Sequence, residues 1–321
     1  MDWSIIVCVF NASIKDIELT LDSIICQKGS SFEIVVADDH SSIDYADFIN
    51  SYISSRKISI GLKYIRNESN LGTVKNILNA VEHSSGRYIK PIGAGDLLYN
   101  SDVLHKMYTY MEDKELSVAF GRISAYKNIA HQYELVSFNN PYDISCYKTN
   151  AQKKIKQNLF IYGDHISGAC LFYERKYIIH YLNLIKDRIF FVEDYMPRIS
   201  ILDNVFIGFL DENVVFYQIG TGISTTNSTK SNQRFINDKK AFISIVKEKE
   251  KDVYIKRYLS LIDIEDKKYP LIWEWIFKII REPQILFYQL KATMARRSNY
   301  NPICRVENLL DIETKGMKKN G

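Results

Sequence analysis

The first hundred residues alternate between two hydrophobic periodicities, and this alternation limits the chain to one class of fold. Short apolar runs, typical of strands buried on both faces of a sheet, are separated by stretches with apolar side chains at helical spacing. The runs cover residues 4–10, 32–37, 58–64 and 87–92, and the helical stretches cover residues 14–25, 45–52 and 74–81. This order predicts an α/β fold with a doubly wound parallel sheet.

Local signals agree with these boundaries. Ser13 and Asp16 stand where a capping box would start the first helix. The third apolar run alternates between apolar and polar residues, which predicts a strand nearer an edge of the sheet. Residues 84–86, Ser-Ser-Gly, supply a stop for the third helix.

Length and composition exclude several classes of protein. A chain of 321 residues favours one main domain with an appendage. The 42 Lys and Arg against 38 Asp and Glu give a net charge of +4, too small to indicate nucleic-acid binding. The five cysteines are scattered without a CxxC pair, and no apolar stretch reaches the length of a membrane span. We therefore expect a cytoplasmic protein, free or attached to the cytosolic face of a membrane.

A polar stretch rich in Ser, Thr and Asn, residues 220–232, predicts a mobile loop that divides the chain. We expect the main domain to cover residues 1–232. Residues 233–321 are then expected to form a helical C-terminal extension.

The C-terminal extension is aromatic and basic, and Pro283 divides it into two helical pieces. Trp273 and Trp275, before the proline, are expected to pack on the main domain. The piece after the proline suits peripheral contact with an anionic membrane. Packing on the main domain, with the basic side chains solvated, is the alternative for this piece as well.

Polar residues follow the predicted strands at the points where the strands end. Asn11 follows the first strand, Asp38 and Asp39 follow the second, and Asp96 follows the fourth. Open α/β sheets bind ligands outside the carboxyl ends of their strands. The sequence therefore predicts a ligand site at this edge of the sheet.

Five segments, in this order along the chain, resemble those of the family 2 glycosyltransferases of the GT-A fold. They are SIIVCVFN from Ser4, LTLDSIICQ from Leu19, EIVVADDHSS from Glu33, NLGTVKNILNA from Asn70 and SGRYIKPIGAGDLL from Ser85. The resemblance extends to about residue 230. It implies an inverting hexosyl- or N-acetylhexosaminyl-transferase of cell-surface polysaccharide synthesis, with a UDP-sugar donor and a glycan or lipid-linked glycan acceptor.

The resemblance implies a nucleotide site formed by Phe10, Asn11, Asp39, Lys75 and Gly95. A uracil ring offers an N–H donor flanked by carbonyl acceptors. Asp39 can accept from that N–H, and Lys75 can donate to a carbonyl. The alternative is that the turn after the second strand is only rich in Asx and Ser caps.

The expected metal site departs from the family's commonest pattern, which places several aspartates at the end of the fourth strand. Gly93 and Gly95 occupy two of those positions, and Asp96 remains. One carboxylate is adequate for Mg²⁺ or Mn²⁺, because Mg²⁺ keeps several waters and also binds diphosphate oxygens. The alternative is a tight turn in which Asp96 caps a helix starting near Asn100.

Residues 190–195, FFVEDY, resemble the family's Glu-Asp motif. Inverting transfer needs one carboxylate that takes the proton of the acceptor hydroxyl. We expect Asp194 to be this base and Glu193 to hold hydroxyl groups of the sugar or the acceptor. An acidic helix N-terminus, where carboxylates interact favourably with the helix dipole, is the alternative.

Residues 163–176, GDHISGACLFYERK, are similar to the family segment that lines the sugar and acceptor site. Ser167, Gly168 and Ala169 are expected to bring backbone close to the donor sugar. His165 is a further candidate, although a single histidine is more often structural.

Two other functions stay open at the level of sequence. A catalytically silent nucleotide-sugar-binding or scaffold protein would explain Gly93 and Gly95, but not the retention of Asp96 and the Glu193–Asp194 pair. A nucleotidyltransferase would require a glycine-rich, basic triphosphate loop near the N-terminus, which the sequence does not contain.

Overall fold

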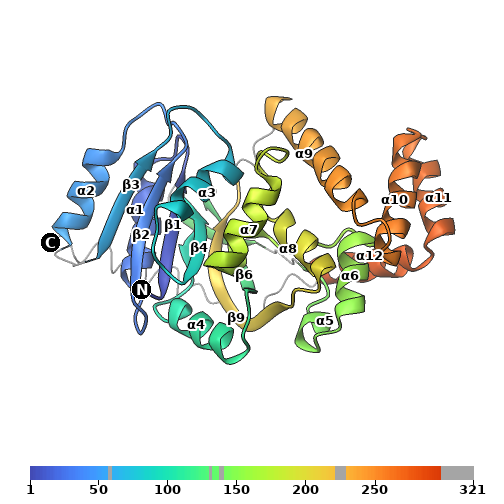
Figure 1. Cartoon of the computed structure of the whole chain (residues 1–321), viewed down its shortest axis with the longest axis horizontal. Helices are drawn as coiled ribbons and strands as arrows, with labels where there is room; N and C mark the ends of the chain where they lie inside the picture. Colours follow the sequence, from blue (N-terminus) through green and yellow to red (C-terminus); the bar gives the residue numbers. More distant parts are fainter. Residues whose placement is uncertain (57–59, 130–131, 137–140, 221–228, 298–321) are drawn as a thin grey trace.

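The computed structural model describes residues 1–56, 60–129, 132–136, 141–220 and 229–297, and Figure 1 shows a mixed α/β domain followed by helices. The strands of the described residues form one sheet in the order β3-β2-β1-β4-β8-β6-β9-β5, with β7 paired to β6. The strands are β1 (Trp3–Val9), β2 (Phe32–Asp38), β3 (Gly61–Arg66), β4 (Tyr88–Gly93), β5 (Leu97–Leu98), β6 (Val118–Ile129), β7 (Gln132–Val136), β8 (Leu171–Glu174) and β9 (Ile207–Gln218).

The first half of the fold confirms the predicted alternation. β1 to β4 pair in parallel, and the crossovers are α1 (Ile14–Ile25), α2 (Ala46–Ser55) and α3 (Thr73–Glu82). Ser13 Oγ accepts from the Asp16 backbone N–H at 3.0 Å and donates to the Asp16 carboxylate at 2.7 Å, as the capping box predicts. β3 lies at the edge of the sheet, also as predicted.

The second half makes the sheet mixed. β8 pairs antiparallel with both β4 and β6, whereas β9 runs parallel to β6 and antiparallel to β5. The helices between these strands are α4 (Val103–Asp113), α5 (Ser145–Lys148), α6 (Gln152–Phe160), α7 (Arg175–Ile185) and α8 (Tyr195–Ser200), with short 3₁₀ turns η1 (Gly168–Cys170) and η2 (Ile201–Asp203). The continuous run of parallel strands is therefore limited to β1 to β4, with one further parallel pair between β6 and β9.

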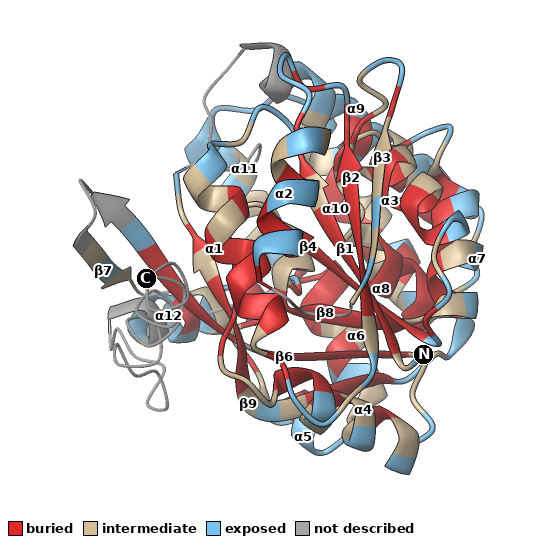
Figure 2. Ribbon diagram, turned by 90° about the vertical axis from the view of Figure 1, so that its left-hand side faces the viewer, coloured by how far each residue is buried: buried red, intermediate tan, exposed pale blue. Residues whose placement is uncertain are grey.

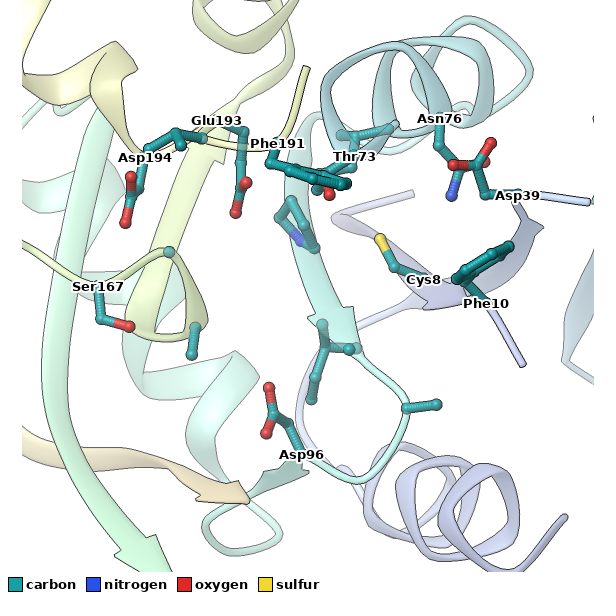
Figure 3. A pocket seen from close by; sticks show the side chains of 18 of the residues that line it. Cys8, Phe10, Asp39, Thr73, Asn76, Asp96, Ser167, Phe191, Glu193 and Asp194 are labelled. Carbon is teal, nitrogen blue, oxygen red and sulfur yellow. The ribbon is translucent and has the colours of Figure 1, made fainter. Parts of the chain in front are cut away.

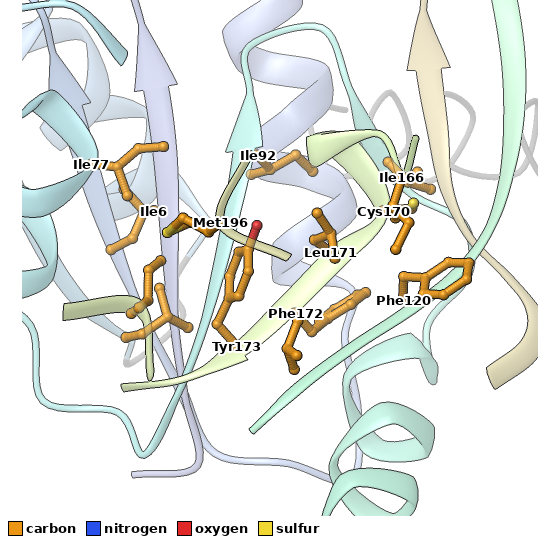
Figure 4. Packing of buried hydrophobic residues seen from close by; sticks show 14 of the residues in the cluster. Ile6, Ile77, Ile92, Phe120, Ile166, Cys170, Leu171, Phe172, Tyr173 and Met196 are labelled. Atoms are coloured by element: carbon orange, nitrogen blue, oxygen red, sulfur yellow. The ribbon is translucent and has the colours of Figure 1, made fainter. Parts of the chain in front are cut away.

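One buried cluster holds these two halves together. Ile6 of β1, Ile77 of α3, Leu171 of β8 and Met196 of α8 all belong to it (Figure 4). Figure 2 shows that the strands through the centre of the sheet are buried. Burial of each large aliphatic side chain contributes about 1.5–3 kcal/mol. The cluster therefore fixes the ends of β1 and β4 relative to the segments that precede β8 and α8.

The C-terminal region is helical, as expected, and lies to the right in Figure 1. It consists of α9 (Thr229–Lys247), α10 (Val253–Asp266), α11 (Leu271–Arg281) and α12 (Gln284–Arg297). The expected domain boundary at residue 232 falls within α9. Residues 221–228, the middle of the predicted loop, lie outside the described part of the chain.

The expected packing of Trp273 and Trp275 on the main domain is wrong. Their side chains are 53% and 45% exposed, and α11, which is described throughout, has no buried residue. The physical reason is that α11 contacts its neighbour through charged side chains. Lys278 Nζ, for example, lies 2.7 Å from the Glu265 carboxylate on α10.

In contrast, α12 is tied to the main domain. Tyr288 Oη donates to Asp164 Oδ2 at 2.5 Å, and its ring stacks on that of Tyr162 with centroids 4.5 Å apart. Ile285 and Ala292 are buried. Among the described helices, none is both long and apolar enough to cross a membrane.

Candidate active site

A cavity of about 1000 Å³ opens where the carboxyl ends of β1, β2 and β4 meet the segments before β8 and α8. This volume is at the upper end of the range for small-molecule sites. Figure 3 shows Asp39 and Phe10 on one side of the cavity, Glu193 and Asp194 on the opposite side, and Asp96 on the loop below. The predicted site residues that line the cavity are Phe10, Asn11, Asp39, Asp96, His165, Ser167, Gly168, Ala169, Glu193 and Asp194.

Asp39 follows β2 and is almost fully buried. Its Oδ1 accepts from Asn67 Nδ2 at 2.9 Å and from the Leu71 N–H at 2.7 Å, and its Oδ2 accepts from the Gly72 N–H at 2.8 Å. A carboxylate has about four acceptor positions. Asp39 therefore shapes the turn before α3, and its three accepted hydrogen bonds are one fewer than a carboxylate can accept.

Phe10 and Asn11 follow β1 in different roles. Phe10 is 43% exposed and offers an aromatic face at the rim of the cavity. Asn11 adopts a left-handed backbone conformation, with φ of 51°, and its Oδ1 accepts from the backbone N–H and the hydroxyl of Ser42, each at 2.8 Å. Asn11 thus links the ends of β1 and β2.

Two predicted nucleotide residues, Lys75 and Gly95, are not among the described residues that line the cavity. Lys75 Nζ lies 3.1 Å from the Asp187 carboxylate, at the surface. Gly95 donates its N–H to Thr20 Oγ1 and accepts from Tyr126 Oη, so both of its backbone groups are used inside the fold. With φ of +101°, Gly95 shapes the turn that carries Asp96.

Asp96 is buried at the bottom of the cavity. Its Oδ1 accepts from the Gln218 N–H at 2.9 Å. Burial raises the pKa of Asp96 to about 7, against the opposing effects of this hydrogen bond and of Lys90. The alternative that Asp96 caps the next helix is wrong, because α4 begins at Val103 and Asp102 is its N-cap residue.

The surroundings of Asp96 fit a hard divalent cation. A buried carboxylate with a raised pKa lacks sufficient positive charge nearby, and a bound cation would supply it. The side-chain Oε1 of neighbouring Gln218 is also buried without a hydrogen-bond partner in the described structure. Within the described residues, no group of three or more His, Cys, Asp or Glu could hold a metal ion. A metal at Asp96 would therefore depend on ligand oxygens and water as well.

Glu193 and Asp194 lie at the start of α8, with their carboxyl groups enclosed by the cavity walls. Burial raises the pKa of both, and the neighbouring Asp194 charge raises that of Glu193 further. Arg198, one helical turn later, opposes the effect of burial on the pKa of Asp194. Asp194 is therefore the member of the pair that ionises more readily.

Asp194 occupies the N-cap position of α8, but in the described structure its side chain makes no capping hydrogen bond. A hydrogen bond from the Gly168 backbone to Asp194 instead lowers the pKa of its carboxyl group. A capping hydrogen bond thus does not account for Asp194, whereas a favourable interaction with the dipole of α8 stays the alternative.

Gly168 lies against the Glu193–Asp194 pair. A Cβ atom at this position would be 2.5 Å from Glu193 Oε1 and 3.6 Å from Asp194 Cβ. The absence of a side chain at residue 168 therefore allows the Glu193 carboxylate to touch the segment that contains Ser167 and Ala169. His165, in the same segment, is exposed and lines the cavity.

Substitution of Gly168 by alanine is expected to lower kcat/KM by about 10²-fold without unfolding the protein. The new methyl group would push the Glu193 carboxylate away by about 1 Å, and a displacement of this size can cost that factor. Steady-state kinetics and thermal melting measure the two effects. Gly61→Ala is the matched control, because its Cβ would meet only ordinary contact at 3.4 Å. Unchanged kinetics in Gly168→Ala would contradict a role for the Glu193 carboxylate in the reaction.

Sequence comparison decides the family. Residues 4–182 match glycosyl transferase family 2, which is more than half of the chain. The chain belongs to glycosyl transferase family 2. No curated protein sequence matches it.

Solved structures show the same fold as this glycosyltransferase. TarS 1–349 of S. aureus in complex with UDP-GlcNAc superposes with a TM-score of 0.55 at 17% identity, covering 92% of this chain and 90% of that chain. Its complex with UDP gives 0.53 at 16% identity, covering 92% and 89%. The mannosyltransferase PcManGT from Pyrobaculum calidifontis, in complex with GDP-Man and Mn²⁺, gives 0.52 at 12% identity, covering 99% and 88%. The predicted GT-A fold with a helical C-terminal region is confirmed.

The structure of the glycosyltransferase adds residues that the sequence did not single out. Asp238 of α9 is buried, and its carboxylate accepts from the backbone N–H groups of residues 190, 191 and 192 at 2.8, 2.7 and 3.2 Å. It thus holds the segment that leads into Glu193. The available signal in the sequence was a single acidic residue in an otherwise basic helix.

Lys90 of β4 is fully buried behind the cavity of the glycosyltransferase. Its Nζ donates to the backbone carbonyls of Ala169 at 2.5 Å and Leu171 at 3.2 Å. Burial lowers its pKa to about 8, although Asp96 and Glu193 both act to raise it. A lysine in an apolar strand was the signal in the sequence, because a lysine is rarely fully buried without partners.

Proposed function

We propose that this glycosyltransferase transfers a sugar from a UDP-sugar to a hydroxyl group of a glycan or lipid-linked glycan, with inversion at the anomeric carbon. One observation carries the proposal. A single cavity has the uracil-compatible acceptor Asp39 on one side, the Glu193–Asp194 pair on the other, and Asp96 below them (Figure 3). The base of the nucleotide would meet Asp39, the diphosphate would lie near Asp96, and the sugar would meet the Glu193–Asp194 pair. The UDP and UDP-GlcNAc complexes of TarS support this choice of donor.

Asp194 is the proposed general base. The acceptor hydroxyl attacks the anomeric carbon of the donor, the bond from that carbon to the diphosphate breaks, and Asp194 takes the hydroxyl proton. Asp194 is suited to this role because Arg198 favours its ionised form. Glu193, whose pKa is raised by burial and by Asp194, is suited to donate to a sugar or acceptor hydroxyl.

Asp96 is the proposed protein ligand of Mn²⁺ or Mg²⁺. When bound, the ion would neutralise charge on the departing diphosphate. The complex of PcManGT with GDP-Man and Mn²⁺ supports this proposal. Lys90 keeps positive charge behind Asp96 and Glu193.

We further propose a role in cell-surface polysaccharide synthesis in the cytoplasm, at the cytosolic face of a membrane. The cysteines are scattered along the chain, and those in the described residues are free, which suits a reducing compartment.

A panel of nucleotide sugars, each incubated with and without Mn²⁺, tests the reaction. We expect slow hydrolysis of a UDP-sugar that requires the metal, and faster turnover when a glycan acceptor is added. A silent binding protein would retain UDP affinity without any turnover. That result would contradict the proposed transfer.

Asp39→Asn is expected to weaken UDP binding by about 10–100-fold, because a hydrogen bond to a charged group contributes about 1.5–3 kcal/mol. It should also reduce the preference for UDP over CDP, since cytosine presents an acceptor where uracil presents an N–H. Titration calorimetry with both nucleotides measures the affinity and the ratio.

Asp38→Asn is the matched control for this prediction. The Asp38 carboxylate accepts from the Ser41 N–H and from Tyr64 Oη, so its loss should lower the melting temperature and leave the UDP to CDP ratio unchanged. If a folded Asp39→Asn variant kept the wild-type ratio, Asp39 would not recognise the base.

A further inference from the structure

Helix α11 presents its apolar side chains to solvent. Leu271 is 82% exposed, and Ile272 and Ile280 are 68% and 70% exposed. Trp273, Trp275 and Ile276 are also exposed. An ordinary surface helix turns such residues toward the core and its charged residues toward water.

Glu274 and Lys278, two of the charged residues of α11, are half-buried instead. Lys278 pairs with Glu265 of α10 at 2.7 Å and with Glu274 of its own helix at 2.6 Å. Arg281 Nε donates to Ser260 Oγ of α10 at 3.3 Å. Lys278 and Glu274 thus serve packing within the protein, and the apolar side of α11 is left for a partner.

The exposed apolar residues continue onto α12, beyond Pro283. Phe287 is 72% exposed and Met294 is 71% exposed. We call the whole set the α11–α12 apolar surface, and its members are Leu271, Ile272, Trp273, Trp275, Ile276, Ile280, Leu286, Phe287, Leu290 and Met294. Large apolar side chains exposed on two successive helices in this number indicate an interaction site.

The net charge of the segment that carries this surface indicates the kind of partner it binds. Residues 267–297 contain seven Lys and Arg and two Asp and Glu. Both acidic side chains are already paired, Glu274 with Lys278 and Glu282 with Arg257. Lys267, Lys268, Arg281 and Lys291 remain exposed to solvent. Exposed apolar and aromatic side chains in a segment with this excess of positive charge fit the interface of an anionic membrane.

We propose that the α11–α12 apolar surface inserts into the interfacial layer of an anionic lipid bilayer. A second copy of the chain fits less well, since a symmetric contact would bring the same positive charges face to face. The proposal does not depend on the sugar-transfer chemistry, because it concerns a surface that can be tested without substrate.

The tryptophans provide a direct probe of this surface. The chain has three tryptophans, of which Trp3 is fully buried and Trp273 and Trp275 lie on α11. Full-length protein is mixed with vesicles of phosphatidylcholine and phosphatidylglycerol, or of phosphatidylcholine alone. We expect a blue shift of emission and co-sedimentation with the anionic vesicles, both weakened by salt.

The test variant carries Ile272→Gln, Ile280→Gln and Phe287→Gln, which leaves both probe tryptophans in place. The matched control carries Ile43→Gln, Phe206→Gln and Val253→Gln, three similarly exposed apolar side chains elsewhere on the protein. We expect the test variant to bind anionic vesicles at least about tenfold more weakly than the control, which should bind like wild type.

Three outcomes would overturn the proposal. The first is that wild-type protein does not bind anionic vesicles at low salt. The second is that the test variant binds as well as the control. The third is that sedimentation shows a wild-type dimer that the test variant loses, because a second copy would then cover the surface. UDP affinity, measured on the same variants, should be unchanged and reports separately on the proposed donor site.

Discussion

Replacement of Asp194 by asparagine is expected to lower kcat by about 10²–10⁴-fold, the usual contribution of a general base. Asparagine keeps the shape of the side chain but cannot take the acceptor proton. Donor affinity should be unchanged, since the base acts on the acceptor. Single-turnover kinetics with saturating donor would measure the loss, and UDP calorimetry would verify the site.

The pH profile gives a second readout of the same group. The base must be ionised, so kcat should fall as the pH decreases through its pKa, which burial has raised. Arg198→Leu removes the charge that opposes this rise and should move the acidic limb to higher pH. If the acidic limb of the pH profile did not move in Arg198→Leu, the ionisation of Asp194 would not be its cause.

Glu193→Gln is the matched comparison. Glutamine retains hydrogen bonding to sugar hydroxyls, so its loss of kcat should be smaller than that of Asp194→Asn. The reverse order would make Glu193 the base. NMR of the product linkage adds an independent check, because a retained anomeric configuration would contradict single displacement.

Asp96→Ala should lower turnover by about 10³-fold and make the remaining activity insensitive to EDTA. A metal ion at a departing diphosphate contributes several kcal/mol, and each 1.36 kcal/mol is a tenfold change in rate. Full turnover of wild-type enzyme in excess EDTA would show that the reaction does not require a metal ion. Asp102→Asn, at the N-cap of α4, is the control for a nearby carboxylate and should keep its metal dependence.

The same carboxylate predicts how metal affinity depends on pH. The pKa of Asp96 is raised to about 7, so the charged form is lost as the pH falls below 7. Binding then has to displace a proton, and apparent Mn²⁺ affinity should fall about tenfold per pH unit below that value. Calorimetry in two buffers with different ionisation enthalpies would detect the released proton.

The sequence predicted the first half of the fold well, because its signals are local. Continuous apolar strands and the Ser13 capping box depend on residues close together in the chain. The antiparallel insertion of β8 between β4 and β6 has no such local signal, since it depends on pairing between distant segments. The periodicity of the sequence therefore predicted where strands occur along the chain, but not the order in which all of them lie in the sheet.

The candidate site was predictable where a residue directly follows a strand or precedes a helix. Asp39 and Asp96 line the cavity because the strand ends place them there. The sequence did not predict that Lys75 pairs with Asp187, because Asp187 is remote in sequence. It also did not predict the exposure of Trp273, which depends on how α10 and α11 pair. Such choices are decided by tertiary contacts, which a single sequence does not display.

The hydrogen bond from Tyr288 to Asp164 has a consequence for any shortened form of the enzyme. Asp164 is buried next to His165, and this hydrogen bond lowers a pKa that burial raises. A protein that ends at residue 232, where the sequence motifs end, would lose this hydrogen bond and also the contact with α12 that helps to bury Asp164. The segment with His165, which lines the cavity, would then have different electrostatic surroundings from those in the full chain. The helical region thus supports one wall of the cavity as well as forming a separate surface.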